Sequence, residues 1–275
     1  MTSSERRVLI LCKTYPSPSA KYAETSCVAG MDEDGNLIRL YSVPFRLIGD
    51  DQQFKKWHWI TARLEKSRND HRPESHKLYV DTIGCDDREL PPDNQWLARR
   101  LWLDKLPVFP SFADVESARQ AEGTTLALLR PSRIVRLDIT PVASPTWTDE
   151  EKAKLIRLQQ QEDLFDDTDK GSVAQLRKLP YDFHYCYECE TPEGPVERRH
   201  KIVDWEIGAL YWNVHRRHGA AWEKPFREKL ESYLPVQDLM FLMGTIHRFP
   251  DKWLIVSLIY PPKQRPWQEA QAPLF

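Results

Sequence analysis

The chain has 275 residues, a formal net charge of −2, and a composition that is 41% hydrophobic and 29% charged. This length is enough for one large or two modest domains with proper cores. The near-neutral charge excludes a strongly basic coat for nucleic acid, although a local basic face remains compatible with it.

No segment approaches the ~20 apolar residues that a membrane-spanning helix needs, and the apolar run after Arg7 is too short for a signal peptide. The five cysteines are odd in number and widely scattered. We therefore expect no disulfide framework, no membrane partner and a reducing, cytoplasmic location.

The first half is predicted to consist mainly of short strands. Residues 7–12 form an apolar run that suits a buried strand, and residues 24–30 and 36–41 flank an Asp-Gly hairpin turn. Further predicted elements are strands at 54–65, 77–83, 124–130 and 134–140 and a helix at 94–106. Trp, Tyr and Phe occur ten times each, which favours sheets over a helix bundle.

The second half begins with a capping box. Thr148 and Glu151 have the spacing of a reciprocal helix cap, which predicts a helix from there to about Phe165. The elements predicted after it are a hairpin of residues 181–188 and 196–203, helices at 205–218 and 222–234, and a hairpin of residues 238–247 and 253–260. Period-2 alternation places Phe183, Tyr185 and Tyr187 on one face of their strand.

The C-terminal tail ends in a candidate docking peptide. Gln271, Leu274 and Phe275 resemble the peptide by which bacterial polymerases and repair proteins bind the DNA sliding clamp. A glutamine amide can bond at a pocket rim while Leu-Phe fills an apolar pocket. A second match lies at 161–165, where the packing of an amphipathic helix explains the same residues. The alternative for the tail is that it folds back onto its own domain.

Two constellations could hold a metal. Cys186 and Cys189 with His200 could begin a zinc site, but a closed site needs four ligands, and the alternative is ordinary hairpin cysteines. His200, Asp204 and Glu206 could instead bind a divalent metal for phosphodiester hydrolysis. The competing interpretation makes Asp204 a helix N-cap and Glu206 a favourable first-turn acid. Our primary expectation is no catalytic residue, no cofactor and no bound metal.

Basic residues beside aromatic ones indicate nucleic-acid binding, because bases stack on exposed rings while cations hold phosphates. The candidate residues are Lys55, Lys56, Trp57, Trp59, Arg198, Arg199 and Lys201. The alternative is that Trp57 and Trp59 point into the core and the cations lie in solvent.

Several short segments resemble a bacterial family without an assigned activity whose members carry two OB-like barrels. The matching pieces are Cys27-Val-Ala-Gly30, residues 37–41, residues 202–207, Gly244 with His247, residues 253–255 and residues 260–262. The resemblance implies two OB-like halves and a nucleic-acid role, and it brings no catalytic residues.

We therefore expect an α+β protein with two small barrel-like halves joined by a helix and followed by a flexible tail. The expected divisions are 1–143, a connector at 144–171, 172–263, and a tail at 264–275. The leading hypothesis is a nucleic-acid-binding accessory protein recruited to replication or repair, or acting in phage defence. The alternatives are a metal-dependent nuclease using His200, Asp204 and Glu206, and an interaction adaptor that binds no nucleic acid.

Overall fold

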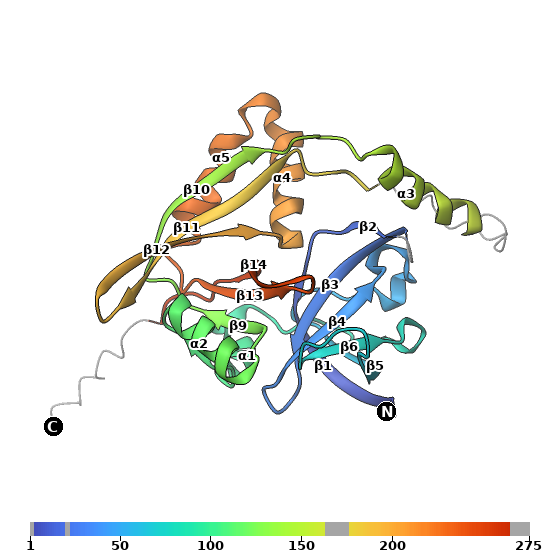
Figure 1. Cartoon of the computed structure of the whole chain (residues 1–275), viewed down its shortest axis with the longest axis horizontal. Coiled ribbons are helices and arrows are strands. Elements are labelled where there is room, and N and C mark those ends of the chain that lie inside the picture. Colours follow the sequence, from blue (N-terminus) through green and yellow to red (C-terminus); the bar gives the residue numbers. More distant parts are fainter. Residues whose placement is uncertain (1–2, 20–22, 163–175, 265–275) are drawn as a thin grey trace, which may run out of the picture.

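The computed structural model describes residues 3–19, 23–162 and 176–264. It contains two seven-stranded sheets, the first formed before residue 86 and the second after residue 107. Figure 1 shows the first sheet beside the second, with α4 and α5 over the second. The predicted α+β class is confirmed.

Five strands of the first sheet close into a barrel. The strands of this sheet are β1 (Ser4–Lys13), β2 (Ser17–Ser19), β3 (Ala23–Met31), β4 (Leu37–Val43), β5 (Trp59–Lys66), β6 (Ser75–Leu78) and β7 (Gly84–Cys85). The order β1-β3-β4-β6-β5 returns to β1 through the β1–β5 pairing, and β4 and β6 run parallel. Numbered within the barrel, this is the order 1-2-3-5-4 of an OB-like fold. Three short 3-10 helices accompany it: η1 (Phe45–Leu47), η2 (Asp50–Gln52) and η3 (Val80–Thr82).

Residues 8–12 of strand β1 are buried on both faces of the strand, which explains their unbroken apolar run. Val8 and Ile10 belong to the core inside the barrel. Leu9 and Leu11 alternate to the opposite face and pack against Leu242 and other residues of the second sheet. The two halves therefore share a hydrophobic core and do not meet only through polar surfaces.

The second sheet has the order β10-β11-β12-β14-β13-β9-β8. Its strands are β8 (Val108–Phe109), β9 (Leu126–Leu129), β10 (Arg133–Pro141), β11 (Tyr181–Thr191), β12 (Gly194–Ile202), β13 (Met240–Ile246) and β14 (Phe249–Ile259). Within the described residues its two end strands are not paired with each other, so this sheet is open where the first is closed.

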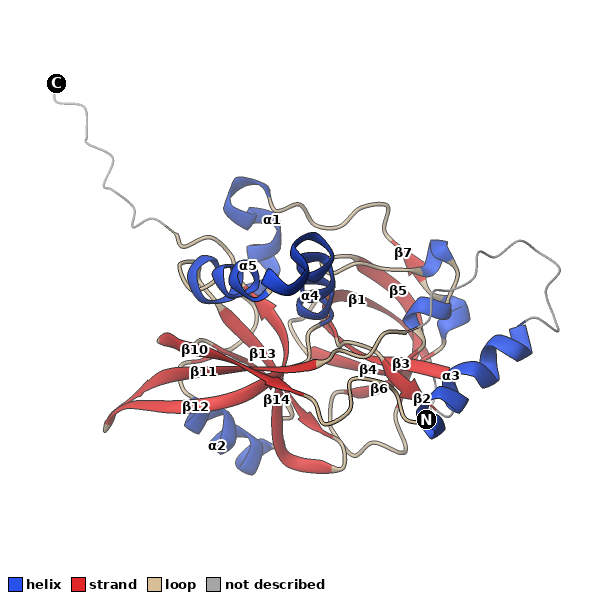
Figure 2. Cartoon of the chain, turned by 90° about the horizontal axis from the view of Figure 1, so that it is seen from above, coloured by secondary structure: helices blue, strands red, loops and turns tan. Residues whose placement is uncertain are grey.

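Helices pack on both sheets: α4 and α5 lie over the second sheet, whereas the helix of residues 149–162 lies beside β2 and β3 of the first (Figure 2). These helices are α1 (Asp93–Leu103), α2 (Phe112–Glu122), α3 (Asp149–Glu162), α4 (Trp205–His218), η4 (Gly219–Ala221), α5 (Glu223–Arg227) and the π-helical turn η5 (Glu228–Tyr233). Phe183, Tyr185 and Tyr187 are all buried in the core beneath α4 and α5, as the period-2 pattern predicted. The Tyr185 hydroxyl donates to the Leu230 carbonyl at 2.7 Å, so its polar end is satisfied within the apolar core.

The predicted capping box starts α3. The Glu151 amide donates to the Thr148 hydroxyl at 3.2 Å, and the Thr148 amide donates to the Glu151 carboxylate at 2.8 Å. Both donors at the helix start are thereby satisfied, as this motif requires.

The predicted strand at 54–65 was wrong for residues 54–58, because β5 begins only at Trp59. Trp57 has a left-handed backbone with φ of 71°, so the alternation expected from Phe54 onward starts only at Trp59. The helix predicted at 94–106 begins with left-handed residues, because Asn94, Gln95 and Trp96 have φ between 48° and 66°. This turn places the Trp96 ring 5.3 Å from that of Trp57.

Sheet membership changes between β7 and β8. Strands β9 and β10 pair within the second sheet, although they lie before the division expected at residue 143. The expected divisions at 143, 171 and 263 remain predictions.

None of the helices in the described ranges is long and apolar enough to cross a membrane, and all five cysteines are free.

A buried arginine joins the two sheets. The Arg39 side chain on β4 is 2% exposed and pairs with the Glu74 carboxylate at 2.9 Å. Its guanidinium also donates to the Thr125 carbonyl at 2.8 Å, directly before β9 of the second sheet. The Thr125 hydroxyl in turn donates to Glu74. Each charge is thus paired and hydrogen-bonded, which is the condition for tolerating it in the interior.

Replacing Arg39 with methionine is expected to lower the free energy of unfolding by about 3–5 kcal/mol, because Glu74 stays buried without a counter-charge. Arg7→Ala is the matched control, because the Arg7 side chain is 41% exposed in its pairs with Glu33 and Asp86. This substitution is expected to lower the free energy of unfolding by less than about 1 kcal/mol. Urea unfolding of the two variants measures both values. Equal losses of unfolding free energy in the two variants would contradict the role given to the buried Arg39 pair.

Candidate functional site

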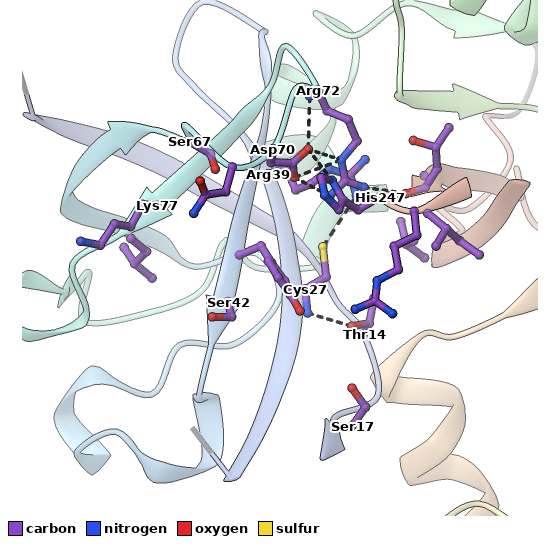
Figure 3. A pocket seen from close by; sticks show the side chains of 18 of the residues that line it. Thr14, Ser17, Cys27, Arg39, Ser42, Ser67, Asp70, Arg72, Lys77 and His247 are labelled. Carbon is purple, nitrogen blue, oxygen red and sulfur yellow. Dashed lines mark hydrogen bonds and ion pairs between the residues drawn. The ribbon is translucent and has the colours of Figure 1, made fainter. Parts of the chain in front are cut away.

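A groove with a volume of about 1140 Å³ crosses the barrel where it faces the second sheet. Its walls come from the segment after β1, from β3 and β4, from the loop between β5 and β6, and from the β13–β14 hairpin. Figure 3 shows side chains from these segments gathered around it. In OB-like barrels the second and third strands and the loops after strands 1 and 4 form the face that binds oligonucleotides. Here β3, β4 and the two loops occupy those positions.

The loop between β5 and β6 is held in a fixed shape by Asp70. Its carboxylate accepts hydrogen bonds from the Arg72 guanidinium at 2.6 and 2.9 Å and from the Ser75 hydroxyl at 2.8 Å. Burial alone would raise the pKa of Asp70, but the bonds from Arg72 and Ser75 hold it well below its usual value. Asp70 is therefore ionised at neutral pH.

Arg72 fastens this loop to the second sheet. Its side chain is 5% exposed and donates to the Thr245 carbonyl of β13 at 2.7 Å. With Arg39, it is the second buried guanidinium of the barrel that bonds to a backbone carbonyl of the other half. Both arginines lie in the groove wall, so the contacts that join the halves also shape the groove.

The groove is electropositive. Its lining contains six cations, Arg39, Lys66, Arg68, Arg72, Lys77 and Arg248, and two acids, Glu65 and Asp70. Adding Glu74, the partner of Arg39, gives six positive and three negative charges, or +3. The chain as a whole carries −2, so positive charge is concentrated here.

Three exposed side chains in the groove lining are suited to contact a ligand. Tyr41 is 51% exposed on β4. Lys77 and Arg248 are exposed, and within the described residues neither forms a salt bridge with a carboxylate. The Lys77 ammonium lies over the Tyr79 ring, 4.4 Å from its centroid. An exposed ring together with exposed cations is the combination that binds single-stranded nucleic acid, because the ring stacks on bases and the cations meet phosphates.

Thr245 lines the groove, but its hydroxyl oxygen is buried. The residue is 3% exposed, and its Oγ1 has no hydrogen-bond partner among the described residues. A buried hydroxyl without a partner costs free energy, and this atom has no surface accessible from the groove.

The tryptophans predicted to stack on bases are core residues. Trp57 and Trp59 are each 4% exposed, and they pack edge-on against Trp96 and Trp102 at 5.3 and 4.7 Å between ring centroids. Both rings therefore point into the core, which was the alternative to base stacking. Neither ring is available to a base in this structure.

The neighbouring lysines are also engaged within the protein. The Lys56 ammonium is 9% exposed and donates to the Leu258 carbonyl at 2.7 Å and to Glu206 at 3.2 Å. Burial lowers its pKa, but the charges of Glu206 and Asp204 outweigh burial and raise it. Lys55 is exposed and lies 3.5 Å from Glu89.

The basic residues of β12 lie outside the groove. The Arg199 guanidinium pairs with Asp138 at 2.8 Å, and the Lys201 ammonium pairs with Asp182 at 2.7 Å. Arg198 is exposed on the same strand, opposite Tyr187 of β11. Acidic partners on β10 and β11 therefore balance much of the positive charge expected here.

The residues of the proposed nuclease centre have separate structural roles. Asp204 caps α4 by accepting from the Glu206 amide, and it also accepts from the Leu258 amide, both at 2.8 Å. Glu206 pairs with Lys56. His200 packs against Phe112 at 4.5 Å between rings and bonds to the Tyr187 hydroxyl at 3.0 Å. Within the described ranges, His200, Asp204 and Glu206 do not form a group of potential metal ligands.

The two hairpin cysteines face opposite sides of the sheet, because they lie three residues apart on the regular strand β11. Cys189 joins the core, whereas the Cys186 thiol donates to the Asp138 carboxylate at 3.3 Å. They do not form a ligand group with His200 within the described part of the chain.

The docking peptide of Gln271, Leu274 and Phe275 lies outside the described residues, as do Leu164 and Phe165 of its helical counterpart.

The sequence patterns did not predict the groove residues Tyr41, Lys77 and Arg248. One usable signal was the polar stretch at 67–74 between two strands, since binding residues concentrate in such loops.

The fold and groove define an OB-like barrel joined to an open, helix-covered sheet, with a cationic cleft at the junction. The chain belongs to the family described as domain of unknown function DUF8757, whose model matches residues 108–275. A second model, domain of unknown function DUF8758, matches residues 4–105. The two matches meet where the barrel ends and the second sheet begins.

No curated protein matches this sequence. Among solved structures, the chain is similar to a replication protein A heterotrimer bound to ssDNA, at 9% identity and a TM-score of 0.26. That match covers 94% of this chain and 66% of the other chain. With so low a TM-score, this likeness supports no conclusion about the present chain.

His200 predicts a pH dependence of stability. Burial and the charge of Arg198 lower its pKa to about 4, from an ordinary value near ~6.5. Between these values the unfolded chain binds more protons, so the free energy of unfolding falls as pH drops and levels off below about 4.

His200→Phe is expected to remove about 2–3 kcal/mol of the stability difference between pH 7 and pH 4. Urea unfolding across this range, compared between the parent and the variant, measures the difference. If the free energy of unfolding of the variant depended on pH as steeply as that of the parent, His200 would not be the group responsible.

Proposed function

We propose that this protein binds single-stranded nucleic acid in the groove between the barrel and the β13–β14 hairpin. The observation that carries the proposal is the position of the groove on β3, β4 and the loops after β1 and β5. These are the barrel surfaces on which OB-like folds bind oligonucleotides.

The side chains in the groove support the same ligand chemistry. Tyr41 offers an exposed ring on β4, and cations come from Lys77 on β6 and from Arg248 in the turn between β13 and β14. A strand lying along the groove would stack a base on Tyr41 and place phosphates near the two cations.

Tyr41→Ala is expected to weaken binding of a fluorescein-labelled oligothymidylate by roughly tenfold, because one stacked base contributes about 1–3 kcal/mol. Tyr233→Ala is the matched control, since Tyr233 is 50% exposed but does not line the groove. Fluorescence anisotropy at low salt measures both affinities. An equal effect of the two substitutions, or no binding by the parent, would contradict the proposal.

We further propose that Gln271, Leu274 and Phe275 recruit the protein to replication or repair sites by binding the sliding clamp. The support is the sequence pattern itself, a glutamine followed by spaced apolar anchors at the end of a polar segment. Such docking would bring the groove to single strands exposed during DNA synthesis.

Removal of residues 271–275 is expected to abolish binding to a purified bacterial sliding clamp while oligothymidylate affinity stays unchanged, because the proposal assigns the two ligands to different residues. Surface plasmon resonance with immobilised clamp measures the first effect. The full chain with Gln268→Ala is the control, since Gln268 lies in the tail but outside the motif. Clamp binding that survives the truncation would exclude this peptide.

A further inference from the structure

Three potential metal ligands lie close together beside the groove, and two of them, Asp70 and His247, line it. Asp70 and His71 lie in the loop between β5 and β6, and His247 lies in the turn between β13 and β14. One ligand atom of each residue lies within 4.8 Å of the other two. Figure 3 shows Asp70 and His247 next to each other beside Arg72.

The Asp70–His247 contact already has nearly the spacing of two ligands on one ion. The His247 Nδ1 atom lies 3.2 Å from the Asp70 carboxylate. Two ligands bonded at about 2.1 Å in a tetrahedral site lie about 3.4 Å apart. An ion bound by both atoms therefore needs only a small increase in their separation.

The third ligand can reach the same point. The His71 and His247 rings lie 5.5 Å apart between centroids with a tilt of 36°. Both residues are exposed, and within the described part of the chain no hydrogen bond holds the His71 ring. Rotation of this side chain can bring its ring nitrogen toward Asp70.

The surroundings of Asp70 resemble the outer shell of a metal ligand. Its carboxylate is 9% exposed and is fixed by the Ser75 hydroxyl and by Arg72, whose Nη1 is itself bound to the Thr245 carbonyl. Such partners orient a ligating carboxylate. Arg72 also repels a cation, so the two imidazoles must supply much of the binding energy.

We propose that Asp70, His71 and His247 bind one divalent transition-metal ion of the zinc type, which bridges the barrel loop and the β13–β14 hairpin. Two imidazoles and one carboxylate favour zinc and its first-row neighbours over magnesium or calcium. Three protein ligands leave a coordination position open to the groove.

Calorimetry of the full chain with Zn²⁺, in the absence of nucleic acid, tests the site independently of the proposed function. We expect one ion per chain, with affinity lowered at least tenfold in His71→Ala and in His247→Ala. His218→Ala is the matched control, because His218 is exposed at the end of α4 and should leave the affinity unchanged.

Two further readouts separate this site from cysteine binding and from misfolding. Co²⁺ should bind without a thiolate charge-transfer band, and Zn²⁺ should raise the melting temperature of the parent but not of His247→Ala. Absence of stoichiometric binding would overturn the proposal, and so would binding that the two histidine variants leave intact or that shows a cobalt–thiolate band. Loss of oligothymidylate binding alone would bear only on the proposed function.

Discussion

The structure depends on two buried arginines that join the barrel to the second sheet. Arg39 and Arg72 each neutralise a carboxylate of the barrel and donate to a backbone carbonyl of the other half, at Thr125 and Thr245. A guanidinium can satisfy several acceptors at once in a fixed plane, which lysine cannot do. These bonds add directional constraint to an apolar interface formed by β1 and β13, which by itself would tolerate sliding. The same two residues line the groove, so its shape depends on how the halves are joined.

This arrangement explains how an acidic chain can present a cationic site. Two of the three cations of β12, Arg199 and Lys201, are paired with Asp138 and Asp182, and Lys56 is paired with Glu206. In the groove, by contrast, Glu74 and Asp70 form their salt bridges with the buried Arg39 and Arg72. The exposed cations Lys77 and Arg248 therefore have no salt bridge to these acids and can contact a ligand. A density of cations along the sequence therefore does not locate the site. The distribution of their carboxylate partners does, and only the folded chain shows it.

Much of the fold follows from local patterns in the sequence. The hairpin of β11 and β12, the helix α4 and the capping box of α3 could be predicted because alternation, helical caps and turn residues act over a few residues. The site could not be predicted in the same way. Trp57 and Trp59 lie between cations in the sequence, yet they are buried because α1 brings Trp96 and Trp102 against them. Tyr41 and Arg248 are about two hundred residues apart and meet only through the pairing of the two halves.

The central claim is that the groove, and not the outer face of β10–β12, contacts nucleic acid. Ultraviolet crosslinking of the full chain to a 4-thiouridine- or 4-thiothymidine-substituted single strand, followed by peptide mass spectrometry, maps the contact directly. The account predicts adducts at Tyr41 and in the loop between β5 and β6, which line the groove. Adducts confined to Arg133, Arg136 and Arg199, which lie outside it, would contradict the account.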